Sequence, residues 1–96
     1  MKCGWTYIMT NRRHGVLYTG VTADIAARVT QNRTGKGSAF CRRYNCVRLV
    51  LEEPHDSIDY AIAREKVLKS WKRAWKIESI EASNPEWDDL YDRING

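Results

Sequence analysis

The chain opens with two apolar segments separated by a polar one, which is the pattern of a β-hairpin. Residues 5–10 and 16–22 are rich in aromatic and β-branched side chains, and the polar segment 11–15 ends in glycine. This pattern predicts two antiparallel strands joined by a turn. With a loop of about four residues, Tyr7 would face Tyr18 across the hairpin, and two phenols would stand side by side.

Helix signals dominate the remainder of the chain. Thr22 or Asp24 can cap a helix that runs to about residue 33 and ends at Gly35. The further elements expected are a short helix over 39–43 after Ser38, a strand over 47–51, a helix over 58–70 capped by Ser57, a helix carrying Trp75, Ile77 and Ile80, and a last short element opened by residues 84–87. This order predicts an α+β fold, with a small antiparallel three-stranded sheet flanked by helices, in a single domain over residues 1–96.

Two charged residues stand out within the predicted helices. Glu65 lies at helical spacing from Ala61 and Leu68, where a carboxylate is costly unless it is paired or binds a cation. The periodicity leaves two explanations open, an ion pair with Lys69 and a metal ion. Arg28 follows the hairpin on a short helix, where its guanidinium fork suits a phosphate, although a plain surface arginine fits the pattern as well.

Tyrosine, glycine and cysteine positions carry weaker signals. By pattern alone, Tyr7 and Tyr18 are ordinary sheet residues, and Gly20 weakens its strand unless another group must approach the backbone closely. The three cysteines are an odd number without a CxxC pair, which argues against a disulfide framework and favours a reducing cytoplasm. The spacings of these cysteines and of the two histidines match no ordinary zinc site.

Charge is distributed unevenly along the chain. Residues 1–50 carry nine Lys/Arg against one acid, whereas residues 51–96 carry seven Lys/Arg against eleven acids, within a net charge of +4. This asymmetry predicts a basic face for a polyanion such as nucleic acid, with a merely solvated basic surface as the alternative. No apolar run reaches the roughly 18 residues of a membrane span, and no leader pattern opens the chain, so we expect no membrane association.

Several motifs in order resemble the GIY-YIG endonuclease superfamily. Tyr7-Ile8 and Tyr18-Thr19-Gly20, with ten residues between the two tyrosines, are similar to its paired motifs, and Arg28 falls where the family has a helical arginine. The segments 36–45, 63–66 and 71–76 resemble the small stand-alone bacterial branch, which is similar to the N-terminal part of UvrC. The likeness extends over roughly residues 5–91. One departure is Asn32, which stands where the family usually has a histidine and cannot take a proton near pH 7.

The resemblance implies a metal-dependent endonuclease that hydrolyses DNA phosphodiester bonds in repair, recombination or DNA uptake. It implies that Glu65 holds Mg²⁺ or Mn²⁺ and that Arg28 clamps the phosphate. Tyr7 would be the general base, with a pKa lowered by Arg28 or by the cation, and Tyr18 would orient Tyr7 or the phosphate. The substrate-binding residues that it implies are His14, Gly20, Asn32, Lys36, Arg42, Arg43 and Tyr44, and His14 could supply the missing imidazole.

The substrate and the rival functions are inferred from what the sequence lacks. The chain carries no separate DNA-binding domain, so we expect a monomer that acts on single-stranded or branched DNA rather than on a long duplex site. The first rival is a catalytically weak or inactive nucleic-acid-binding module, which the missing histidine favours. The second is a protein-interaction domain whose basic half meets an acidic partner. A cleavage assay with and without Mg²⁺ separates the nuclease from both rivals.

Overall fold

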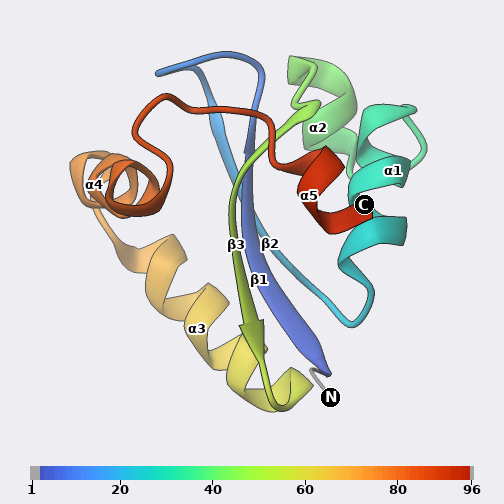
Figure 1. The fold of residues 1–96 in the computed structure, drawn as a ribbon, viewed down its shortest axis with the longest axis vertical. Coiled ribbons are helices and arrows are strands. Elements are labelled where there is room, and N and C mark those ends of the chain that lie inside the picture. Colours follow the sequence, from blue (N-terminus) through green and yellow to red (C-terminus); the bar gives the residue numbers. More distant parts are fainter. Residues whose placement is uncertain (1–2, 96) are drawn as a thin grey trace.

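A three-stranded antiparallel sheet in the order β2-β1-β3 forms the centre of the computed structural model, which describes residues 3–95 (Figure 1). Its strands are β1 (Gly4–Thr10), β2 (Leu17–Thr22) and β3 (Arg48–His55). The helices are α1 (Ile25–Arg33), α2 (Ala39–Tyr44), α3 (Ile58–Ser70), α4 (Arg73–Ser83) and α5 (Tyr91–Asn95). The predicted α+β class, with helices flanking a small antiparallel sheet, is confirmed.

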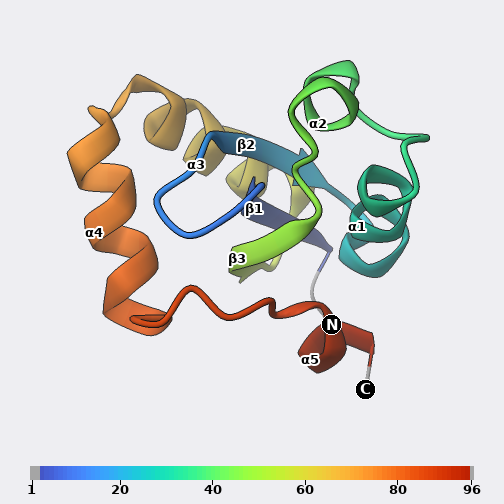
Figure 2. The same ribbon diagram turned by 90° about the horizontal axis from the view of Figure 1, so that it is seen from above.

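Helices cover both faces of the sheet, with α3 and α4 on one face and α1, α2 and α5 on the other (Figure 2). Because side chains alternate along a strand, neighbouring residues of β1 serve different faces. Thr6 donates a hydrogen bond from Oγ1 to the carbonyl of Ala61 on α3, at 2.8 Å. Tyr7 and Met9 instead belong to the apolar cluster that includes Val29 of α1. The central strand therefore ties together two separate cores.

The register of the hairpin differs from the predicted one. Tyr7 pairs with Gly20 rather than with Tyr18, so the predicted pairing was wrong by two residues. The connection is longer than assumed: it spans 11–16, and the side-chain oxygen of Asn11 closes it by accepting a backbone N–H at its far end, at 3.0 Å. A shift of two residues keeps every side chain on its predicted face, so the two phenols remain diagonal neighbours.

Capping residues begin three helices where the sequence predicted them. Asp24, rather than Thr22, caps α1, because its carboxylate accepts the N–H of Ala27 at 3.1 Å. The hydroxyls of Ser38 and Ser57 cap α2 and α3 in the same way. The predicted bounds of α3 are confirmed. These caps are local signals, and local signals survive folding well.

Two elements differ from the sequence prediction. Strand β3 continues to His55 rather than ending at Leu51, and it includes Pro54, which an edge strand tolerates because no ladder hydrogen bond is lost there. Residues 84–87 form a turn closed by the N–H of Trp87, and α5 starts only at Tyr91. None of the helices in the described part of the chain has the length and apolar character that a membrane span requires.

Candidate active site

Tyr7 lies on the central strand and is buried under the sheet face that α1 and α2 cover. Its ring centroid is 6.3 Å from that of Tyr18, with the planes inclined by 48°. The Tyr7 hydroxyl is one of two buried side-chain oxygens in residues 3–95 that make no hydrogen bond; the other belongs to Thr19. Leaving a buried hydroxyl unpaired costs about 1–3 kcal/mol. The site thus contains a polar atom that the protein itself does not satisfy.

Gly20 makes room for this phenol. A Cβ atom at position 20 would lie 2.5 Å from both Oη and Cζ of Tyr7, closer than any real contact. The sequence signal, a glycine inside a strand, is explained by this approach of the Tyr7 ring to the β2 backbone. Whether Gly20 also contacts a substrate stays a prediction.

Arg28 and Asn32 stand one helical turn apart on α1 and both approach the Tyr7 hydroxyl. Each lies near enough to stabilise a phenolate by hydrogen bonding, but the neutral hydroxyl has no hydrogen-bond partner in the structure. Asn32 is buried: its Oδ1 accepts the N–H of Ser38 at 2.9 Å, and its Nδ2 lies 3.4 Å from the sulfur of Met9. Asn32 therefore holds the loop before α2 against the site. Its predicted contact with a substrate is untested.

Burial raises the pKa of Tyr7 above its ordinary value of 10.0, and the neighbouring Tyr18 raises it further. Hydrogen bonding to Arg28 and Asn32 and the charge of Arg28 lower the pKa, but these effects are smaller. The expectation that Arg28 lowers the pKa of Tyr7 overall was wrong for the protein alone, because desolvation of the phenolate outweighs the nearby cation. Tyr7 keeps its proton at neutral pH.

Glu65 lies on α3, on the opposite side of the sheet from Tyr7. Its side chain is 15% exposed, and Nζ of Lys69 is 3.2 Å from its carboxylate, so the predicted ion pair is present. On the same helix Ala61 faces the sheet, and Arg64 reaches sideways to Glu53 of β3 at 2.9 Å. Successive helical residues point about 100° apart, so Glu65 occupies the other flank, toward the edge strand β2.

This carboxylate suits a hard cation, although the described residues contain no group of three or more His, Cys, Asp or Glu that could enclose one. Magnesium usually keeps several waters and binds through one or two carboxylates together with substrate phosphate oxygens. A single half-buried Glu65 beside an open strand edge fits that mode of binding, with Lys69 as the competing cation.

Glu52 is a second half-buried carboxylate, which the sequence did not single out. It lies opposite Tyr7 in the β1–β3 pairing, on the same sheet face. Its side chain is 17% exposed, and Arg93 of α5 lies 3.7 Å from it. Glu52 is thus matched to Glu65 in burial and in having a cationic partner.

A row of aromatic rings leads from the site to the surface. Tyr18 stacks on Phe40 with centroids 5.7 Å apart, and Phe40 meets Tyr44 at 4.7 Å. Phe40 and Tyr44 are exposed, and the guanidinium of Arg43 lies 5.4 Å from the Tyr44 ring centroid. Sequence reasoning missed Phe40; the predicted helix over 39–43 ended one residue before Tyr44, so the spacing of four residues that places both rings on one face of α2 was not noticed. Lys36 and Arg42 are exposed on the loop before α2 and on α2.

His14 is held elsewhere, at the tip of the hairpin beside α4. Its ring lies 4.8 Å from that of Trp87, and Nε2 is 3.3 Å from the carboxylate of Glu81. Arg73 donates to the carbonyls of His14 and Gly15 at 2.8 and 2.6 Å. Because α4 and Trp87 belong to the core on the opposite face from Tyr7, the structure does not bring this imidazole to the phenol.

Two neighbouring tyrosines on adjacent strands, with an arginine on the helix that follows, lie within a small α+β domain. The GIY-YIG catalytic domain model matches residues 3–78, and the chain belongs to this family of nucleases. It is 34% identical to a UPF0213 protein of Staphylococcus epidermidis over 67 residues, which are 70% of this chain and 82% of the relative. A UPF0213 protein of Streptococcus sanguinis is 36% identical over 67 residues, 70% of this chain and 77% of the relative. No solved structure matches the chain significantly.

Replacing Gly20 by alanine tests the packing of Tyr7. We expect Gly20→Ala to lower the free energy of unfolding by about 1–3 kcal/mol, because the new methyl overlaps a phenol that cannot move freely. Urea denaturation measures this. In a Tyr7→Leu background the same substitution should cost clearly less, because the overlapping phenol is gone. Equal costs in both backgrounds would show that the two residues do not constrain one another.

Proposed function

We propose that this protein is a metal-dependent endonuclease that hydrolyses phosphodiester bonds of single-stranded or branched DNA, in repair, recombination or uptake. The observation that carries the proposal is the buried, unpartnered hydroxyl of Tyr7 beside Arg28 in a domain of a nuclease family. The attacking water or a phosphate oxygen would be the missing hydrogen-bond partner. The cost of the unpaired hydroxyl is then recovered only when substrate is present.

The side chains divide the work in this proposal. Arg28, half-buried at the rim, donates two hydrogen bonds to the non-bridging oxygens of the scissile phosphate. Tyr18 orients the phosphate or the Tyr7 hydroxyl from the neighbouring strand. Tyr7 acts in its ionised form: its phenolate oxygen takes the proton of the attacking water as the water oxygen bonds to phosphorus and the bond from phosphorus to the leaving oxygen breaks. Asn32 is a positioning residue in this proposal, because it holds the loop before α2 against the site.

Nucleases of this family generally use divalent metal ions. In our proposal Glu65 holds the ion, Mg²⁺ or Mn²⁺, and Lys69 gives up its ion pair when the ion enters. When bound, the cation supplies charge stabilisation for the leaving oxygen. Because Glu65 and Tyr7 stand on opposite sheet faces, the phosphate is expected at the edge strand β2, where both faces can be reached.

Exposed aromatic rings beside the site favour unpaired DNA as the substrate. Phe40 and Tyr44 are partly exposed rings beside which unpaired bases can stack, whereas duplex bases are already stacked on one another. Lys36, Arg42 and Arg43 supply cations for the backbone along the same loop and helix. This combination of stacking surfaces and cations is typical of single-strand binding.

A catalytically inactive nucleic-acid-binding module is the second candidate. Two observations favour it: Asn32 stands where the family usually has a histidine, and the pKa of Tyr7 is raised. The deciding experiment incubates the protein with labelled single-stranded, duplex and forked oligonucleotides in parallel, with Mg²⁺ or with EDTA. Cleavage only with Mg²⁺, and preferentially in unpaired regions, is expected. Binding of all substrates without cleavage would establish the alternative.

Glu65→Gln should abolish Mg²⁺-dependent cleavage and leave DNA affinity nearly unchanged, because it removes one cation ligand and no basic group. Single-turnover cleavage and fluorescence anisotropy measure the two effects. Glu52→Gln is the matched control, equal in burial and in loss of an ion pair, and it should keep near-normal activity. The metal role of Glu65 is rejected if Glu52→Gln loses activity while Glu65→Gln keeps it.

Arg28→Lys should retain less than about one tenth of the cleavage rate, since an ammonium group cannot make the two-pronged contact with a phosphate. Arg33→Lys, on the same helix, is a useful comparison because Arg33 is held by Asp89 and the Tyr91 ring instead. If Arg28→Lys cleaves at nearly the wild-type rate, Arg28 contributes only its positive charge and not a two-pronged contact with the phosphate.

Tyr7→Phe should slow cleavage on the order of 10²–10⁴-fold and remove its pH dependence. A base acts only after losing its proton, and the pKa of Tyr7 is raised, so the phenolate fraction grows about tenfold per pH unit throughout the neutral range. For the unaltered protein we therefore expect kcat/KM to rise from pH 6 to pH 9 without a plateau. A plateau near pH 7, or the same rise in Tyr7→Phe, would mean that another group is the base.

A further inference from the structure

A cationic segment joins α3 to α4 within an otherwise acidic half of the chain. Residues 64–76 contain six Lys/Arg and one acid, although residues 51–96 as a whole have an excess of acids. Two of these cations lie over indole rings: the guanidinium of Arg64 is 5.0 Å from the centroid of Trp71, and Nζ of Lys72 is 5.9 Å from that of Trp75. Positive charge and aromatic surface thus coincide on this part of the molecule.

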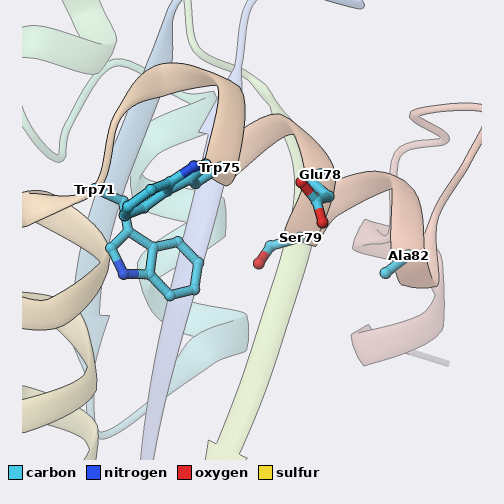
Figure 3. A pocket seen from close by; sticks show the side chains of 5 residues that line it. All are labelled: Trp71, Trp75, Glu78, Ser79 and Ala82. Carbon is cyan, nitrogen blue, oxygen red and sulfur yellow. The ribbon is translucent and has the colours of Figure 1, made fainter.

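The two tryptophans border a shallow hollow of about 440 Å³ (Figure 3). The two indole rings meet edge to face where α3 passes into α4, with centroids 6.3 Å apart and planes inclined by 83°. Glu78, Ser79 and Ala82 continue the lining further along the helix. Residues 75, 78, 79 and 82 recur at helical spacing, so the hollow follows one face of α4, and Trp71 borders it from the turn before the helix.

Packing does not account for the position of Trp75. Its side chain is 52% exposed, whereas α4 is fixed to the sheet core by Ile80, which is fully buried. A single exposed aromatic residue is ordinary on a protein surface, but Trp75 differs from Tyr60 because it lines a hollow together with Trp71 and lies beside Lys72. The groups around it indicate what binds.

We propose that the Trp71–Trp75 hollow is a second contact site for unpaired nucleotides, on the sheet face opposite Tyr7. A base stacks on the open face of the Trp75 indole, and Lys72 binds the adjoining phosphate. Glu78, one turn further along α4 from Trp75, repels phosphates and so keeps the backbone on the Lys72 side. This inference deepens the proposed function and rests on it, since it assigns the site to the same substrate.

The charge around the hollow favours an unpaired nucleic acid strand over a second copy of the chain as the partner that binds there. A symmetric dimer through the hollow would set the cationic segment 64–76 against itself, and like charges across an interface disfavour association. A polyanion gains from the same charges, and its flat bases fit beside an indole ring. The nucleic acid strand is therefore the better match.

The test is fluorescence anisotropy of a labelled oligothymidylate with EDTA present, so that binding is measured without cleavage. Trp75→Ala should raise the Kd about 5-fold to about 150-fold, the effect of losing one base–aromatic stack. Trp75→Tyr keeps a ring and should stay within about threefold of the unaltered protein. Tyr60→Ala is the matched control, because Tyr60 is a 68% exposed aromatic at the other end of α3, and its Kd should change less than about twofold.

Three results would overturn the site: an unchanged Kd in Trp75→Ala, an equal loss in Tyr60→Ala, or a dimer that Trp75→Ala converts to a monomer in gel filtration. Cleavage measured separately with Mg²⁺ distinguishes the two proposals. A protein that binds through Trp75 but never cuts retains this site and lacks the proposed activity. A protein that cuts normally while Trp75→Ala binds normally lacks only this site.

Discussion

The contact between the Tyr7 phenol and the backbone of Gly20 determines the arrangement of the candidate active site. With no Cβ at position 20, the ring packs against β2, and its hydroxyl ends in a buried position beside Arg28 and Asn32. The burial that fixes the phenol also raises its pKa. The same contact therefore positions the proposed base and keeps it protonated, so reactivity depends on the groups that enter with the substrate.

Alternation along β1 imposes a second constraint, because it separates the two proposed catalytic groups. Tyr7 points to α1, while Thr6 next to it holds α3 through the carbonyl of Ala61. The Arg64–Glu53 ion pair fixes one flank of α3 to β3 and leaves Glu65 on the flank toward β2. A phosphate that engages both Tyr7 and Glu65 must therefore approach the free edge of the sheet.

Features with a recognisable local signal could be read from the sequence, whereas the closure of the hairpin loop and the features set by distant contacts could not. Ser57 correctly predicted the start of α3, because an N-cap hydrogen bond involves only the residues that directly follow the cap. The hairpin register depends on Asn11 closing a longer loop, for which the sequence carries no distinct signal. The motifs pointed to Tyr7 and Arg28, but the raised pKa arises from desolvation by the assembled core, which no spacing reveals. The His14 ring lies away from Tyr7 because Trp87 and Glu81, far along the chain, contact it.

The two aromatic surfaces bear on the form of the substrate. Phe40 and Tyr44 belong to α2 on one side of the sheet, and Trp71 and Trp75 belong to the α3–α4 side. Both surfaces pair exposed rings with cations, as single-strand sites do. A linear strand bound on one face has no need of the other, whereas a forked substrate has two unpaired arms. Taken together, the two proposals favour a branch point at the edge of β2, with one arm on each face.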